Sequence, residues 1–194
     1  MSIGTAIVTV FGFIFLLLIT LALWAILLYN ALVAKRELVN EGWSSIDVQL
    51  KRRFNLIKNL VSVVKGYASH ETETLEKLTN ARSAAYTDDP QERASAEQEI
   101  GAALVNMLSV TESYPDLKAD GNFRNLQKKL SDLEDFIQKS RRYYNGTVRD
   151  YNTITQTFPS VIIANMYRFQ QATFFELEDP AERQLTTVDF GSDQ

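Results

Sequence analysis

Apolar residues recur at intervals of three and four along most of the chain, which is the spacing of amphipathic helices rather than strands. The pattern is regular from Val39 to Val64. Gly42 is the only Gly or Pro between Gly12 and Gly66, so little in this stretch would interrupt a helix. The sequence therefore predicts one long helix that continues without a joint to about Ser69.

Four further helices are predicted downstream, and the sequence shows no strand alternation and no repeat of fixed period. The clearest periodicity runs from Phe123 to Phe158. Asp89 and Pro90 are the types of residue expected at the N-cap and at the first position of a helix. The predicted helices cover residues 72–87, 91–113, 123–158 and 160–171. Together these elements predict an all-α fold, an antiparallel helical bundle.

An apolar stretch without any charged side chain runs from Ile3 to Tyr29. As a helix it would be about 40 Å long, whereas the hydrocarbon core of a bilayer is about 30 Å thick. A buried helix of a soluble protein and a cleaved signal peptide are the alternatives, but the stretch is too long for either and no basic side chain precedes it. We therefore expect residues 3–29 to be a transmembrane helix that contacts the lipid bilayer and continues into the bundle.

Charge divides the chain into three segments: an anchor over residues 1–30, a helical bundle over 31–175 and an acidic tail over 176–194. The chain has 20 basic and 24 acidic residues, a net charge of −4. Because much of the acidic excess lies in the tail, the bundle is nearly neutral, and no nucleic-acid partner is expected. The tail is expected to be disordered; the alternative is a short docking segment that orders on a partner.

Basic residues near the anchor all follow it, at Lys35, Arg36 and Lys51–Arg53. The positive-inside rule therefore predicts that the N-terminus lies outside and that the bundle is cytoplasmic. Trp24 and Tyr29 would then lie near the inner boundary of the membrane, where aromatic side chains concentrate.

Short motifs spread over residues 29–176 follow, in order, the pattern of a known family. They are Tyr29-Asn30, Ser45–Arg53, Leu56–Val61, Val64–Ala68, His70-Glu71, Ala81-Arg82, Glu112–Ala119, Asn122-Phe123, Leu126-Gln127, Arg141–Asn145, Tyr151-Asn152, Phe158-Pro159 and Phe174–Glu176. On these motifs the chain resembles the LemA family. The resemblance implies a single-span protein of the bacterial inner membrane with a cytosolic helical bundle. It implies no established enzymatic activity: members look like accessory proteins, often linked by gene neighbourhood to membrane metallopeptidases, and one relative belongs to the magnetosome membrane system.

Residues that carry catalytic or metal chemistry are scarce in this sequence. The chain has no Cys and one His, at position 70. A di-iron bundle needs Glu-x-x-His motifs, and Tyr67 stands three residues before His70. No Gly-x-Ser-x-Gly turn and no glycine-rich phosphate loop is present. We therefore expect no catalytic residue, no metal ligand and no cofactor, and interpret His70-Glu71 as a polar corner.

Arg53 falls where the helical repeat favours an apolar side chain. We expect it to form an internal ion pair, with Asp132, Glu134 or Asp135 as candidate partners. The alternative is a contact of the basic run with anionic lipid. That alternative is disfavoured because Lys51 would stand about 30 Å past the span in a helix, whereas charges are screened over about 8 Å.

Two Tyr-Asn pairs stand one heptad apart in the longest downstream helix. Tyr144 precedes Asn145 and Tyr151 precedes Asn152, so the two Asn share a helix face. One hypothesis is structural, because a buried Asn can fix the register of packed helices. The other is that these residues form a polar groove that binds a peptide or a partner helix.

The last predicted helix is apolar on several sides, which leaves two interpretations of its surface. Ile162, Ile163, Met166 and Phe169, with Trp43, either form an interface between copies of the chain or close the bundle's own core. The first interpretation predicts a homo-oligomer.

Taken together, these features predict a non-catalytic, membrane-anchored adaptor or assembly protein, not an enzyme. Its cytoplasmic bundle would serve self-association or bind a membrane partner. The alternative is an accessory subunit or cofactor of a membrane-associated enzyme such as a metallopeptidase.

Overall fold

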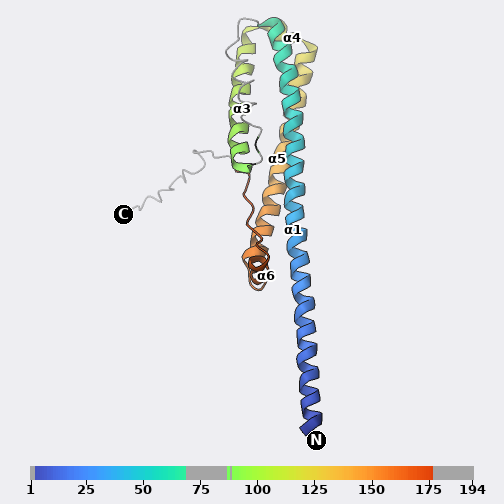
Figure 1. The fold of residues 1–194 in the computed structure, drawn as a ribbon. Coiled ribbons are helices and arrows are strands. Elements are labelled where there is room, and N and C mark those ends of the chain that lie inside the picture. The colour runs from blue at the N-terminus through green and yellow to red at the C-terminus, as the bar shows by residue number, and fades with distance from the viewer. Residues whose placement is uncertain (1–2, 69–86, 88, 177–194) are drawn as a thin grey trace, which may run out of the picture. The chain divides into compact units, whose positions relative to one another are not determined.

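Helices account for all regular structure in the part of the chain that the structure describes. The computed structural model describes residues 3–68, 87 and 89–176. The helices are α1 (Ile3–Tyr67), α3 (Pro90–Val110), the short 3₁₀ helix η1 (Thr111–Ser113), α4 (Pro115–Ala119), α5 (Gly121–Gln156) and α6 (Ser160–Met166) (Figure 1). The predicted all-α class is confirmed. The helix predicted over 72–87, His70, and the tail beyond Glu176 lie outside the described residues.

α1 runs from Ile3 to Tyr67 without a break, which confirms the predicted continuous helix. Large apolar side chains between Ile7 and Leu27 are exposed along its N-terminal part. This part is long and apolar enough to cross a membrane. A helix is suited to that environment because it satisfies its backbone hydrogen bonds internally. The same helix therefore contains a candidate membrane span and one of the packed helices of the bundle.

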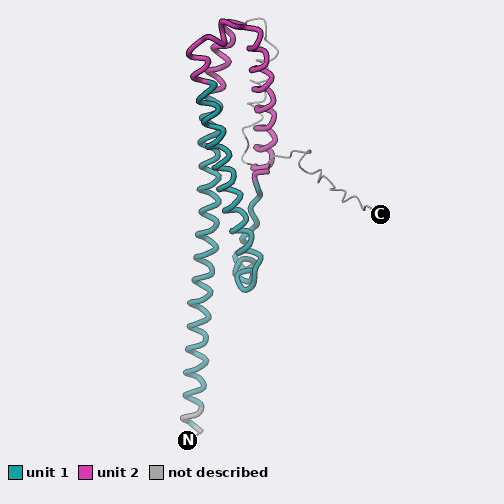
Figure 2. The backbone as a smooth tube through the Cα atoms, turned by 180° about the vertical axis from the view of Figure 1, so that it is seen from behind, with its two compact units in different colours: residues 1–56, 127–174 teal, residues 57–126, 175–194 magenta. Residues whose placement is uncertain are grey.

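The chain divides into two compact units (Figure 2). Unit 1 combines residues 1–56 with 127–174, and unit 2 combines residues 57–126 with 175–194.

In unit 1, α1 and α5 pack as an antiparallel pair. Lys35 Nζ lies 3.1 Å from Asp150 Oδ2, and Arg53 Nε lies 2.8 Å from Glu134 Oε1. Residue numbers thus rise along α1 as they fall along α5, which confirms the predicted antiparallel packing. The seam between these ends contains buried apolar side chains at four- and seven-residue spacing, namely Val39, Ile46 and Leu50 on α1 and Leu133, Ile137, Tyr144 and Val148 on α5.

The predicted internal ion pair of Arg53 is confirmed, and Glu134 is its partner. Arg53 is only 5% exposed. A charge removed from water needs a partner, and the carboxylate of Glu134 provides one. The neighbouring Lys51 instead pairs on its own helix with Asp47, at 2.6 Å.

The backbones of α1 and α5 come close together at Gly42. A Cβ atom at this position would lie 3.1 Å from Tyr144 Cα and 3.3 Å from Thr147 Oγ1. The first of these atoms belongs to the backbone of α5 and cannot rotate away. The lone glycine of this stretch of α1 therefore provides the space in which the two helices meet.

Two helices that begin in unit 2, α3 and α5, have an Asp side chain that caps their N-terminus. Asp89 Oδ1 accepts hydrogen bonds from the backbone N–H groups of Gln91 and Glu92, so Asp89 is the N-cap of α3 and Pro90 its first residue, as predicted. Asp120 plays the same part for α5, since its Oδ1 accepts from the N–H of Phe123 at 2.9 Å. Its second oxygen accepts from the Tyr67 hydroxyl at 3.1 Å.

Replacing Gly42 should reduce stability, because a side chain would press on the backbone of α5. Overpacking of this kind costs about 1–3 kcal/mol, so Gly42→Val should lower the unfolding midpoint of the full chain in detergent, followed by circular dichroism. The matched control is Gly146→Ala on α5, where an added Cβ meets nothing within 4 Å. Gly146→Ala should raise stability by about 0.5–1 kcal/mol, the usual gain for removing a helix glycine. Equal effects of the two changes would contradict the close approach at Gly42.

Asp120 should make stability depend on pH in the acid range. The hydrogen bond from the Phe123 N–H, aided by that from Tyr67, holds the pKa of the Asp120 carboxyl below its usual value. Its contribution to stability is therefore present above the unfolded pKa of about 3.9 and is lost as pH falls through the lower folded pKa. Asp120→Asn keeps a capping oxygen but does not titrate. Denaturant midpoints measured from neutral pH into acid should fall less steeply for Asp120→Asn than for the unchanged chain, and equal slopes would contradict this contribution.

Candidate functional site

The polar residues of α5 singled out from the sequence face a segment of the same chain. After α6, residues 167–174, here called the return segment, run back alongside α5. The Tyr151 hydroxyl donates to the carbonyl of Gln170 at 2.8 Å, and the Tyr144 hydroxyl donates to the carbonyl of Thr173 at 2.8 Å. Because Gln170 meets Tyr151 and Thr173 meets Tyr144, the return segment is antiparallel to α5.

Asn152 binds one residue of the return segment through both of its backbone groups. Its Nδ2 donates to the carbonyl of Ala172 at 2.9 Å, and its Oδ1 accepts from the N–H of Ala172 at 2.8 Å. An amide side chain can reproduce in this way the paired hydrogen bonds of a neighbouring strand. Asn152 is buried, and the bonds satisfy both its own polar atoms and those of the segment.

The spacing of these donors matches the repeat of an extended chain. Tyr144 and Tyr151 are one heptad apart, about 10.5 Å along a helix. Their acceptors, on Thr173 and Gln170, are three residues apart, about 10 Å in an extended segment. Tyrosines at heptad spacing can therefore reach every third carbonyl of an extended chain.

The Tyr151 hydroxyl is suited to act as a hydrogen-bond donor at any pH near neutrality. Burial raises the pKa of its hydroxyl, and the positive charge of Arg36 offsets only part of that rise. The hydroxyl therefore keeps its proton at neutral pH, where it donates to the Gln170 carbonyl.

These contacts show what the Tyr-Asn pairs bind within the chain. Tyr144, Tyr151 and Asn152 hold the chain's own return segment, and binding of a separate peptide or partner helix stays a prediction. Asn145, the fourth residue of the set, is partly buried. The ring of Trp43 packs on that of Tyr144, with centroids 5.6 Å apart. Trp43 therefore belongs to the same packed region.

The predicted last helix is shorter than expected. α6 ends at Met166, not at residue 171. Arg168 has a left-handed backbone, with φ of 57°, and the N–H groups of Arg168 and Phe169 bond to the carbonyls of Asn165 and Ala164. This is the bond pattern of a Schellman motif, usually built with Gly at the left-handed position. With Arg there, the sequence carries no sign of the helix end.

Ile163 lies in the core of unit 1. It is 6% exposed and clusters with Leu32 and Ala164, with Ala25, Leu28, Ile154 and Phe169 packed against them. Phe169 also contacts Tyr29 edge-on and lies under the guanidinium of Arg36. Ile163 and Phe169 therefore pack within the chain. Ile162 and Met166 are instead exposed.

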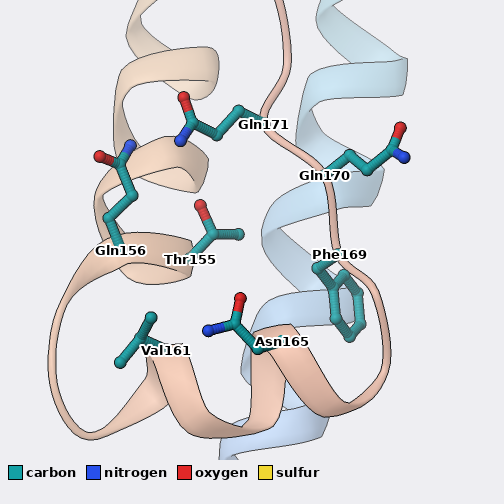
Figure 3. A pocket seen from close by; sticks show the side chains of 7 residues that line it. All are labelled: Thr155, Gln156, Val161, Asn165, Phe169, Gln170 and Gln171. Carbon is teal, nitrogen blue, oxygen red and sulfur yellow. The ribbon is translucent and has the colours of Figure 1, made fainter.

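A pocket of about 540 Å³ opens between the end of α5, α6 and the return segment (Figure 3). Its lining is mainly amide side chains, with one aromatic ring: Thr155, Gln156, Val161, Asn165, Phe169, Gln170 and Gln171. Amides donate and accept but carry no charge. The pocket is therefore suited to an uncharged polar group rather than to an ion. Within the described residues there is also no cluster of His, Asp and Glu that could hold a metal.

Two features of this region were not predicted from the sequence. The close approach at Gly42 is signalled only by a single glycine in a long helical pattern. The return segment has no periodic pattern because it is extended and bound by side chains rather than by a strand. The heptad spacing of the Tyr-Asn pairs indicated a groove but not its occupant.

Removing the Asn152 amide should release the return segment. Asn152→Ala leaves the N–H and carbonyl of Ala172 without this partner, and such a loss costs about 1–3 kcal/mol. Hydrogen exchange at the Ala172 amide should accelerate while exchange in the middle of α1 is unchanged. Thr153→Ala is the matched control, because the Thr153 hydroxyl bonds only to Arg149 on its own helix among the bonds described. Unchanged exchange at Ala172 in Asn152→Ala would show that the amide does not hold the segment.

Comparison with known proteins shows which family and which proteins this chain resembles. A family model described as LemA family matches residues 42–190. The chain is similar to Magnetosome protein MamQ of Magnetospirillum gryphiswaldense, with 23% identity over 79% of this chain and 66% of that protein. It is also similar to Protein LemA of Metamycoplasma hominis (28% identity, 77% and 69% coverage) and to Magnetosome protein MamQ 2 of Paramagnetospirillum magneticum (24%, 79% and 66%). The chain thus spans just under two thirds of the length of the MamQ proteins.

The family match covers most of the α1–α5 packing, the Tyr-Asn groove and the return segment that fills it. With a model that matches well over half of its residues, this chain belongs to the LemA family.

Proposed function

We propose that this protein is a non-catalytic, membrane-anchored adaptor or assembly protein. The observation that carries the proposal is the continuity of α1, which links a candidate membrane span to the packed pair of α1 and α5 without a hinge. Such a link holds a binding surface at a fixed height above the bilayer. The groove residues Tyr144, Tyr151 and Asn152 support a structural role, since their donors bind the chain's own return segment.

A surface for a partner is available on the flank of α5. Phe136 and Tyr143 are both exposed and stand one heptad apart, so they share a helix face. Lys139 lies between them, with its Nζ 5.5 Å from the centre of the Phe136 ring. Tyr and Phe are enriched at the core of protein interfaces, whereas the rim is polar and accessible to solvent. We propose that this face contacts either a second copy of the chain or another membrane protein.

The proposed location is the bacterial inner membrane, with the bundle in the cytoplasm. Lys35 and Arg36, and then Lys51 to Arg53, follow the span, and basic residues are retained on the cytoplasmic side. A phosphatase fused after Gln194 that is active only outside the membrane should remain inactive in cells; strong activity would place the bundle on the other side.

Photo-cross-linking in cells tests the adaptor role. A photoreactive phenylalanine analogue at Phe136 or at Tyr143 should capture one defined protein, which mass spectrometry identifies. Capture of the chain itself indicates self-association. Capture of a membrane metallopeptidase indicates the accessory role that the family resemblance suggests. The same analogue at Gln138, which is exposed on the other flank of α5, is the control.

A charged substitution at the same face should weaken the complex. Burying an exposed Phe contributes about 1.5–3 kcal/mol, so Phe136→Glu should reduce capture from position 143 by about tenfold or more. Gln138→Glu should leave it unchanged. Capture from positions 136 and 143 no greater than from 138 would contradict the proposed surface.

A further inference from the structure

Exposed apolar side chains gather in the α5–α6 turn and on α6. Phe158 is 81% exposed, Met166 is 62% exposed and Ile162 is 55% exposed. Tyr167, directly after α6, is exposed as well. Apolar side chains that are this accessible and this close together usually mark a contact surface.

The exposed side chains lie on the face of α6 that points away from the bundle. Ser160, Ile163 and Ala164 form the buried face, and Ile163 and Ala164 pack on Leu32 of α1. Ile162 and Met166 are one helical turn apart on the opposite side. Val161 and Asn165 point toward the pocket (Figure 3). α6 is therefore amphipathic, with its outer face uncovered.

α6 is held against α1 where the membrane stretch ends. Its core cluster includes Ala25 and Leu28, and the ring of Tyr167 lies 4.8 Å from that of Tyr29, centre to centre. The apolar stretch up to Tyr29 is about 10 Å longer as a helix than the roughly 30 Å hydrocarbon core. The α1 residues that contact α6 therefore fall at the level of the lipid headgroups.

The direction of α6 also fits a membrane surface. α6 runs crosswise to both α1 and α5 (Figure 3). With α1 crossing the bilayer, a crosswise helix lies in the plane of the membrane. Amphipathic helices in this plane bury their apolar face about 5–10 Å deep in the interface. The exposed Arg168, which follows Tyr167, stands where a cation can reach the lipid headgroups.

We propose that α6 and its flanks form a second membrane contact, in which Phe158, Ile162, Met166 and Tyr167 lie in the interfacial layer of the bilayer that α1 crosses. The occupant of this face is lipid, because α6 and Tyr167 pack on α1 at Ala25, Leu28 and Tyr29, which belong to the apolar stretch of the span. The contact sets the distance and tilt of the α1–α5 pair relative to the membrane. It requires α1 to cross the bilayer, but it depends neither on which side the bundle lies nor on the adaptor role.

Depth measurement by site-directed spin labelling tests the proposal on the full chain. The chain contains no Cys, so one introduced Cys is a unique attachment site. Nitroxide labels are placed at Ile162→Cys and Met166→Cys, in protein reconstituted in vesicles of phosphatidylethanolamine and phosphatidylglycerol. Val10→Cys in the span and Gln138→Cys on α5 are the lipid and water controls. All four positions are exposed, so the substitutions should leave the fold intact, as circular dichroism would verify.

Relaxation by oxygen, which concentrates in lipid, is then compared with relaxation by a water-soluble nickel chelate. The labels at 162 and 166 should be relaxed more by oxygen than by nickel, as at Val10 but to a shallower depth. The label at 138 should show the reverse. This result supports an interfacial position of α6.

Three outcomes would overturn the proposal. Nickel access at 162 and 166 as high as at 138 means that the face is in water. Low access to both agents, with spin–spin broadening that disappears on dilution with unlabelled chain, means that a second copy covers it. A water-exposed label at Val10 means that α1 does not cross the bilayer and that α6 has no membrane to contact.

Discussion

The structure depends on α1 being one uninterrupted helix, because the same backbone must serve lipid and protein surroundings in turn. In its N-terminal part the requirement is an apolar surface on every side, with backbone polar groups satisfied within the helix. Beyond Tyr29 the requirement becomes a buried apolar stripe along one face of the helix, at seven- and four-residue spacing, from Leu32 through Val39 and Ile46 to Leu50. A hinge between the two parts would uncouple the bundle from the membrane. Instead, α6 packs on α1 at this transition, through Ala25, Leu28 and Leu32.

A second constraint comes from the extended segment that packs beside the helices. Its backbone N–H and C=O groups need hydrogen-bond partners, and no neighbouring strand provides them. In the return segment, side chains of α5 are the partners. Asn152 replaces a neighbouring strand at Ala172, and the hydroxyls of Tyr144 and Tyr151 cap the carbonyls on either side. The match between seven helical residues and three extended ones makes this arrangement possible. These polar side chains of α5 thus have a structural role, because they form hydrogen bonds with the backbone of the return segment.

The parts of the structure that were predictable are those set by local patterns. The heptad spacing of α1 and α5, the Asp89–Pro90 start of α3 and the misplaced charge at Arg53 each carry their signal within a few residues. The end of α6 does not, because the left-handed residue is Arg168 instead of Gly. Adjacent residues in a short, largely apolar helix are also indistinguishable by composition: Ile163 is core and Ile162 is surface, and only the direction of packing on Leu32 separates them. The occupant of the Tyr-Asn groove depends on a turn many residues away, which no local pattern encodes.

The ion pair of the buried Arg53 with the partly exposed Glu134 is best explained by register rather than by stability. Such a pair often contributes little net stability, since the desolvation of a buried charge offsets the attraction to its partner. Two helices that pack through heptads can, however, slip by seven residues with little change in apolar contact. In the observed alignment Arg53 lies opposite Glu134. A slip by seven residues in one direction would bring Arg53 opposite Arg141, and a slip in the other direction would bring it opposite Gln127. The first places two cations together and the second leaves Arg53 without a counter-charge, so both alternatives are penalised. The alignment that is selected is also the one in which Gly42 meets Tyr144 and in which α6 reaches the part of α1 near Tyr29.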